Sequence, residues 1–445
     1  MAHDKIVVGL DIGTTKICTI VGRMNEYGKV DILGIGQVPS NGGVTRGVVS
    51  NIDKTVNAII DSTKLAGESS NVEINRVHVG IAGAHINSLQ HKGMIIRNDG
   101  ESEISQSDLD KLEADMHKIA VNPGDKIIHV LPQDFTVDNE PGVVDPIGMA
   151  GIKLEGNYHI ITGQITAAKN IYKCVEKSGL KVSDLTLEPL ASSHSVLSDE
   201  EMEAGVVLVD IGGGTTDVAI FHDNIIRHTA IIPYGGNIIT EDIKEGCNVM
   251  KHQAELLKTK FGSALADEST ENEIVSIPGL RGREPKEISV KNLSMIINAR
   301  VSEILELVYY EIKASGLEKK LVGGLVITGG GAMLKNITQL AEFVTGLDAR
   351  IGYPNEHLAK GLVEEVKSPI YATGVGLVLK GLRGETGTHN VFKPQVVEEV
   401  VEEPIQSKVE DEQDQHDMNI KAERREHFFS KFKAWLKDES DIQDF

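Results

Sequence analysis

The sequence is poor in cysteine, aromatic residues and positive charge, and each shortage argues against a class of protein. Its three cysteines, Cys18, Cys174 and Cys247, lie far apart, which suits small core residues in a reducing compartment rather than a disulfide or zinc framework. A net charge of −21 argues against nucleic acid as a partner, because phosphates need a basic surface. No apolar run reaches the ~18 residues of a spanning helix, and residues 1–5 lead straight into a strand-like run, so we expect a cytoplasmic protein.

The two best-known glycine-rich nucleotide signatures are also missing, since neither G-x-x-x-x-G-K-[ST] nor G-x-G-x-x-G occurs. The chain instead has two similar turns, residues 11–16 (DIGTTK) and 210–217 (DIGGGTTD), each between two apolar strand-like runs. Glycine allows a turn with φ > 0 and bare N–H groups, and the threonine hydroxyls add donors for phosphate oxygens. Two near-copies half a chain apart predict duplicated halves that close on a nucleotide.

A third run extends this prediction. Residues 325–328 form an apolar strand, glycines follow at 329–331, and residues 332–334 are expected to begin a helix. Glycines there would let the backbone pass close to a flat ligand such as an adenine ring, and a helix start would point N–H groups at it. The candidates from this run are Gly329, Gly330, Gly331 and Met333.

Other elements follow from apolar spacing and helix caps. We expect helices at about 53–66, 107–119 (capped by Ser105 or Ser107), 164–178, from Glu188 onward, from 236 to about 261, and at 288–316. Strands are expected at 77–81, 93–97, 126–135 and 185–187. Residues 85–163 have a pattern of their own and read as an insert in the first half.

The C-terminal region divides into an acidic and a basic part. Residues 395–417 carry nine carboxylates, one lysine and no aromatics, so we expect a disordered, extended linker. Residues 421–437 carry six basic residues, and a helix over 427–437 places its large apolar side chains in an arc about 120° wide. This pattern favours an interfacial membrane helix, with a protein groove as the alternative. Its residues are Phe428, Phe429, Phe432, Trp435 and Leu436, flanked by Lys431 and Lys433.

In order and spacing, the three glycine runs resemble the two phosphate motifs and the adenosine motif of the actin-like ATPases. With the insert, the acidic linker and the amphipathic tail, the chain resembles the FtsA family of bacterial cell-division proteins. The resemblance implies an α/β, duplicated, actin-like (ribonuclease H-like) fold with an inserted subdomain, 1C. It also implies subdomain 1A at 1–84 and 164–204, 1C at 85–163, 2A at 205–236 and 323–382, 2B at 237–322, a linker at 383–420 and the tail at 421–445.

The resemblance also implies roles for individual residues. The phosphates would be held by Gly13, Thr14, Thr15 and Lys16 from one side and by Gly212, Gly213, Gly214, Thr215 and Thr216 from the other. Asp11 and Asp210 would orient Mg²⁺ through water, and Glu255 and Lys258 would lie against the nucleoside of ATP. Glu188 matches a glutamate that positions the attacking water, although a first-turn glutamate is also favoured by the helix dipole alone.

The implied function is an ATP-binding protein with weak ATPase activity that assembles into filaments. It would tether the FtsZ ring to the cytoplasmic face of the membrane at the division site, as a peripheral protein, and recruit later division proteins. Subdomain 2B would bind the C-terminal peptide of FtsZ through Arg281, Arg283 and Arg300, although the loop that holds the first two also reads as a solvated turn. The alternatives are a binding module of the pilus-assembly type and a small-molecule kinase of the same superfamily.

Overall fold

The computed structural model describes residues 5–99, 102–266, 273–279 and 284–384, all within one compact unit that spans residues 1–392. The predicted linker and tail, with Phe428, Trp435 and the other membrane candidates, lie outside these ranges, as do Arg281 and Arg283. No helix within the described ranges is both long and apolar enough to cross a bilayer.

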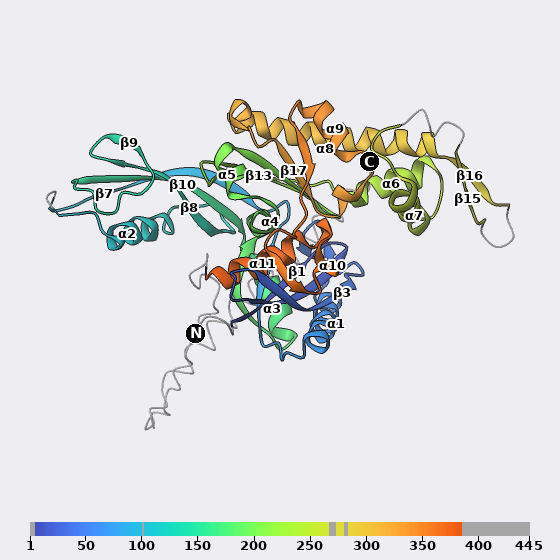
Figure 1. The fold of residues 1–445 in the computed structure, drawn as a ribbon, viewed down its shortest axis with the longest axis horizontal. Helices are drawn as coiled ribbons and strands as arrows, with labels where there is room; N and C mark the ends of the chain where they lie inside the picture. The colour runs from blue at the N-terminus through green and yellow to red at the C-terminus, as the bar shows by residue number, and fades with distance from the viewer. Residues whose placement is uncertain (1–4, 100–101, 267–272, 280–283, 385–445) are drawn as a thin grey trace, which may run out of the picture. The chain divides into compact units, whose positions relative to one another are not determined.

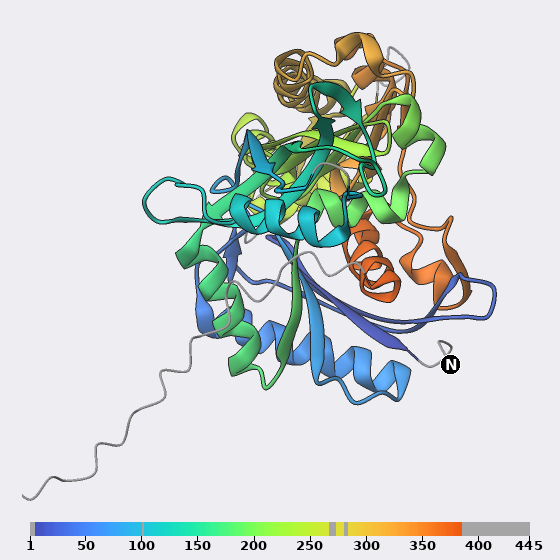
Figure 2. The same cartoon turned by 90° about the vertical axis from the view of Figure 1, so that its left-hand side faces the viewer.

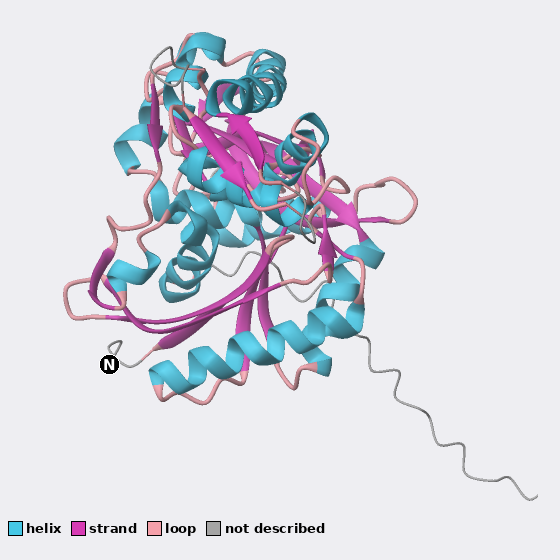
Figure 3. Ribbon diagram, turned by 90° about the vertical axis from the view of Figure 1, so that its right-hand side faces the viewer, coloured by secondary structure: helices cyan, strands magenta, loops and turns pink. Residues whose placement is uncertain are grey.

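The first half is built on a six-stranded sheet in the order β11-β6-β1-β2-β3-β19. Strands β1, β2 and β3 are antiparallel, and β6 and β11 run parallel to β1 on its other side. Helix α11 covers one face of the sheet, and α1 and α3 cover the other (Figures 2 and 3). The bounds are β1 (Ile6–Ile12), β2 (Lys16–Met24), β3 (Val30–Pro39), α1 (Ile52–Ser70), β6 (Arg76–Ile81), α3 (Ile165–Lys177), β11 (Lys181–Leu187), β19 (Leu358–Gly361) and α11 (Ala372–Arg383).

The second half repeats this plan around a five-stranded sheet, β14-β13-β12-β17-β18. Its first three strands are again antiparallel, and β17 runs parallel to β12 as β6 does to β1. The bounds are β12 (Val206–Ile211), β13 (Thr216–His222), β14 (Ile225–Ile232), α6 (Gly236–Gly246), α7 (Lys251–Phe261), α8 (Val290–Ala314), β17 (Leu325–Thr328), α9 (Ile337–Thr345) and β18 (Ala349–Ile351). The predicted duplication is therefore present.

The insert forms a separate four-stranded antiparallel sheet, β7-β10-β8-β9, with a core cluster of its own under α2 (Figure 1). Its elements are β7 (Asn87–Ile96), α2 (Gln106–Met116), β8 (Asp125–Val137), β9 (Glu140–Val143) and β10 (Lys153–Gln164). The remaining short elements are β4 (Val44–Thr45), β5 (Val48–Val49), α4 (Glu188–Val196), α5 (Asp199–Ala204), β15 (Ile274–Ile277), β16 (Lys286–Ser289), η2 (Glu318–Lys320), η3 (Gly330–Met333), α10 (Val363–Val366) and η4 (Pro369–Tyr371).

Most predicted elements are confirmed within a few residues, but three expectations were wrong. Residues 330–333 form only the 3₁₀ turn η3, and the helix begins at Ile337, because Asn336 is left-handed (φ 61°). The helical stretch from 236 to 261 is two helices, interrupted where Asn248 is also left-handed (φ 47°). Within residues 358–382, which the resemblance places in the second half, β19 pairs with β3 and α11 packs on the first sheet.

Candidate functional site

The tips of two hairpins, β1–β2 and β12–β13, lie against each other. Each tip is closed by the same backbone bond, Gly13 N to Lys16 O (3.0 Å) and Gly212 N to Thr215 O (2.9 Å). A Cβ added to Gly213 would lie 2.0 Å from Oγ1 of Thr15, so a larger residue there would have to displace the Thr15 side chain. The structure therefore brings together the residues that the two sequence runs singled out.

Buried carboxylates lie at the base of these tips. Asp11 and Asp210, each at the end of a hairpin strand, are 6% and 7% exposed, and Asp217 is 3% exposed. The Lys16 ammonium lies 2.5 Å from Oδ2 of Asp11. Oδ2 of Asp217 accepts a long bond from the hydroxyl of Thr215 (3.4 Å), whereas its buried Oδ1 has no hydrogen-bond partner.

Burial and mutual repulsion shift the pKa values of these groups. Burial raises the pKa of Asp210 to about 6, and the Asp11 carboxylate adds to the rise against the opposing hydrogen bond from Ser192. Burial and Asp210 raise the pKa of Asp217, and burial with Asp11, Asp217 and Asp210 raises that of Glu188. One lysine thus faces several carboxylates, and a bound cation would relieve the surplus negative charge.

The donor set fits a phosphate–cation ligand. Hydroxyls and glycine N–H groups gather at the tips, and the partnerless Oδ1 of Asp217 is an oxygen ligand of the kind that Mg²⁺ prefers. Across the described ranges, no three His, Cys, Asp or Glu side chains converge as a direct metal-ligand set. That Asp11 and Asp210 orient the ion through water stays a prediction.

Glu255 and Lys258 lie behind the second hairpin tip. The Lys258 ammonium contacts Oε2 of Glu255 (2.8 Å) and the backbone oxygen of Gly236 (2.9 Å), at the start of α6. The N–H of Gly236 in turn donates to the carbonyl of Gly212 (2.8 Å). The predicted pair is therefore connected to the second hairpin tip through the first residue of α6.

The third glycine run packs against the end of β12. Gly329 has φ 80°, and a Cβ there would lie 2.3 Å from Oδ1 of Asp210. A Cβ on Gly331 would lie 2.3 Å from Cγ2 of Ile211. The packing against β12 alone therefore requires glycine at both positions, so these glycines do not by themselves indicate a ligand. Met333 is 62% exposed, and a Cβ on Gly330 would make only an ordinary contact with Cγ2 of Ile370 (3.9 Å).

Sequence reasoning missed three polar residues of this site. Oδ2 of Asp210 accepts bonds from the hydroxyls of Ser192 (2.9 Å) and Thr373 (3.4 Å). Ser192 lies one helical turn after Glu188, so helical spacing could have suggested it. Thr373 lies on α11, 163 residues after Asp210 in the sequence, and no local pattern indicates that it belongs to the site. Asp217 stood in the quoted motif but was given no role.

Arg300, the one predicted FtsZ contact within the described ranges, lies on α8. Its guanidinium donates to both carboxylate oxygens of Asp242 (2.5 and 3.1 Å) and also pairs with Glu303. An acidic peptide would have to compete with these two carboxylates.

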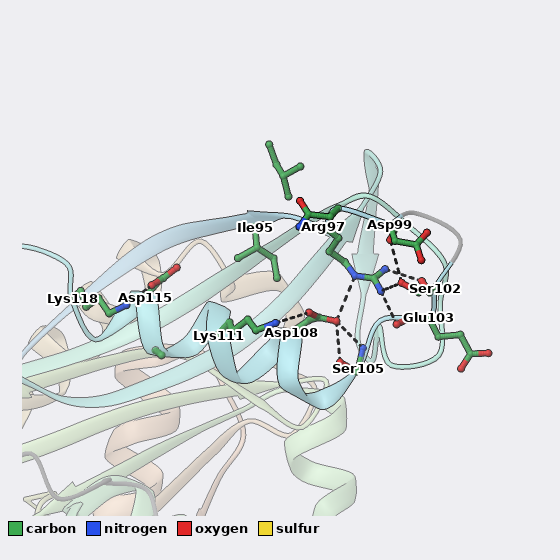
Figure 4. Close-up of a pocket in the computed structure, with 13 residues that line it drawn as sticks. Ile95, Arg97, Asp99, Ser102, Glu103, Ser105, Asp108, Lys111, Asp115 and Lys118 are labelled. Carbon is green, nitrogen blue, oxygen red and sulfur yellow. Dashed lines mark hydrogen bonds and ion pairs between the residues drawn. The ribbon is translucent and has the colours of Figure 1, made fainter.

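A cavity of about 680 Å³ lies on the insert and shares no residue with the hairpin tips (Figure 4). Arg97 donates there to the backbone oxygens of Ser102 (2.9 Å) and Glu103 (2.7 Å) and pairs with Asp108 (3.5 Å). Lys111 also pairs with Asp108. Because these charges are paired among themselves, the cavity is a weaker candidate than the hairpin tips.

Comparison with known proteins agrees with the sequence and the fold. A family model described as "Cell division protein FtsA" matches residues 207–376, and one described as "SHS2 domain inserted in FTSA" matches residues 83–162. The chain is 39% identical over 382 residues to the cell division protein FtsA of Pseudomonas aeruginosa, covering 86% of this chain and 90% of that one. It is 40% identical over 370 residues to the FtsA of Neisseria meningitidis, covering 83% and 88%.

Among solved structures, the chain resembles one from the PilM–PilN type IV pilus biogenesis complex. The TM-score is 0.62 at 14% sequence identity, covering 84% of this chain and 98% of that one. At this identity the likeness concerns the fold alone. Together with the duplicated sheets and the SHS2 insert, it confirms the predicted actin-like fold class.

Proposed function

Because the chain belongs to the FtsA family of cell division proteins, we propose that it binds ATP between its hairpin tips and assembles into polymers. The polymer tethers the FtsZ ring to the inner face of the cytoplasmic membrane at the division site and recruits later division proteins. The contact between the two glycine–threonine tips carries the nucleotide part of this proposal.

The tips bind phosphate from both sides. Thr14, Thr15 and Thr215 offer hydroxyls, and the glycines beside them offer backbone N–H groups. Lys16 supplies the positive charge: although burial opposes it, the Asp11 carboxylate raises the pKa of Lys16 above its ordinary value. Mg²⁺ held through water by Asp11 and Asp210 neutralises phosphate charge when it is bound.

Glu188 is the residue that we propose positions the attacking water. A carboxylate that orients or deprotonates water must be ionised, but burial and the nearby Asp11 and Asp217 raise the pKa of Glu188. This shift belongs to the ligand-free protein, and a cation bound beside these carboxylates would offset it. We infer that nucleotide serves assembly more than turnover.

The membrane contact belongs to the tail. Five large apolar side chains contribute a gross ~8–15 kcal/mol if fully buried. Ordering about ten residues costs ~1–2 kcal/mol each for the backbone. The gain from apolar burial and the cost of ordering are similar, so one tail binds weakly. The polymer supplies firm attachment through avidity. The basic residues add attraction to anionic lipid.

The nucleotide site is tested by titrating the full chain with ATP and Mg²⁺ in a calorimeter. Gly213→Ala should weaken binding by at least about tenfold, because its Cβ forces Thr15 out of place. Gly67→Ala in α1 is the matched control, since its Cβ would meet no tip residue and its nearest atom would be the backbone oxygen of Val72, 3.2 Å away. Equal affinity for all three proteins would refute binding between the tips.

A further inference from the structure

The insert branches from the first half, between β6 and α3, yet its side chains are hydrogen-bonded to the second sheet. Strands β7 and β8 contact β14, which is the edge strand of that sheet. We call three of these bonds the edge latch. They run from Gln133 Nε2 to Ile226 O (2.7 Å), from Gln90 Nε2 to Arg227 O (3.2 Å) and from Ser88 Oγ to Thr229 O (3.1 Å).

The edge latch exists because β14 is both an edge and irregular. An edge strand presents carbonyl groups that no neighbouring strand pairs. The register with β13 also shifts, since Phe221 faces Ile226 while Ile220 faces His228, which leaves Arg227 as an extra residue. Such a bulge re-aims the backbone, and consecutive carbonyls of β14, at 226 and 227, accept bonds from the insert.

A buried histidine completes this contact. His159 of β10 is 1% exposed, and its Nε2 lies 3.0 Å from the hydroxyl of Thr229 while its Nδ1 lies 3.0 Å from Nε2 of Gln90. The Gln90 amide has two hydrogens, one for Arg227 O and one for Nδ1, so a neutral ring protonated on Nε2 gives both ring nitrogens a partner. Burial, with a smaller effect of His228, lowers the pKa of His159 to about 4, which keeps the ring neutral.

The other end of β14 is bonded to the second hairpin tip. After Ile232 the chain enters α6, where the N–H groups of Gly236 and Asn237 donate to the carbonyls of Gly212 and Gly213, both at 2.8 Å. The hydroxyl of Thr216 donates to the carbonyl of Tyr234 (2.8 Å). Strand β14 thus connects the second hairpin tip to the insert.

We propose that the edge latch couples the second hairpin tip to the insert. Nucleotide bound between the tips then makes the insert separate from β14 less often. The inference rests on the proposed nucleotide site. Phosphate bound at the tip restricts the motion of residues 212–216. The hydrogen bonds from this tip to residues 234–237 then restrict the motion of β14 as well. Coupling between two sites is reciprocal, so the insert must in turn affect nucleotide affinity.

The test is hydrogen–deuterium exchange of the full chain with and without ATP and Mg²⁺, alongside calorimetric titration of ATP. The latch variant combines Ser88→Ala, Gln90→Leu and Gln133→Leu. His91→Leu, at an exposed neighbour on β7, is the matched control. Because Gln133 is buried, Gln90→Leu alone, at an exposed position, serves as a second variant if the triple change unfolds the insert.

In the wild type and the control, ATP should slow exchange in residues 87–91 and 225–232 by about threefold or more. The latch variant should lose this slowing and bind ATP more weakly by the same factor, and Gln90→Leu should lose part of both. ATP binding without slower exchange in the wild-type insert, or equal slowing in the latch variant, would overturn the coupling and leave the nucleotide site intact. A wild type that binds no ATP would refute both.

Discussion

Replacing Asp210 by asparagine tests whether the site is under electrostatic strain that a ligand relieves. Burial raises the pKa of this carboxyl from its ordinary 3.8 to about 6. At about 1.4 kcal/mol per pH unit, its charged form costs the ligand-free fold about 3 kcal/mol at pH 7. The asparagine side chain would keep an acceptor for the hydroxyls of Ser192 and Thr373 but carry no charge. Asp210→Asn should therefore raise the free energy of unfolding by up to about 3 kcal/mol.

The sign of the pH dependence makes this prediction specific. Since the folded pKa is raised, the native state binds more protons than the unfolded state between pH 3.8 and about 6. The wild-type carboxyl thus stops destabilising the fold as the pH falls, and the advantage of Asp210→Asn should shrink to about 1.5 kcal/mol at pH 5.

Urea unfolding without nucleotide, at pH 7 and pH 5, measures both values, with Asp61→Asn at an exposed position of α1 as the control. The same variant should bind ATP with Mg²⁺ at least about tenfold more weakly, because the cation loses a carboxylate. A variant that is no more stable than the wild type at pH 7, or whose advantage does not change with pH, would refute the reasoning.

Three further predictions concern other parts of the molecule. Lys380→Met should lower the free energy of unfolding by about 3–5 kcal/mol, because it removes the ammonium that lies 2.7 Å from the buried Asp184 carboxylate; adding Asp184→Leu should recover most of it in urea unfolding. His159, with its pKa near 4, should cost the fold about 2 kcal/mol as the pH falls from 7 to 5, since the unfolded ring charges first; this part of the pH dependence should vanish in His159→Asn. Arg300→Glu should reduce capture of the FtsZ C-terminal peptide about tenfold in a pull-down, whereas Lys313→Glu on the same helix should not; full capture by Arg300→Glu would count against this contact.

The parts of the site that could be predicted from the sequence depend on local pattern. The residues of each hairpin tip are consecutive, so the glycine–threonine runs revealed them without knowledge of the fold. Helices α1, α3 and α8 likewise follow from apolar spacing over more than ten residues. The duplication of the motif also indicated that the two tips would face one ligand.

The rest depends on contacts between distant segments. Nothing near Thr373 indicates that α11 returns to the first sheet and brings its hydroxyl to Asp210. The same holds for the docking of the insert on β14, where Gln133 meets a carbonyl 93 positions away. The short turn η3 was mistaken for a helix start because the left-handed conformation of Asn336 depends on its surroundings.

The central claim is that a polymer of this protein tethers the division ring to the membrane, and sedimentation with anionic vesicles tests it most directly. The intact chain is compared, with ATP and Mg²⁺, with a chain ending before Lys421 and with an intact chain carrying Trp435→Glu. We predict that the intact chain pellets with vesicles and does so less without ATP, while both altered chains stay in solution. Equal pelleting of all three chains, or of none, would contradict the account.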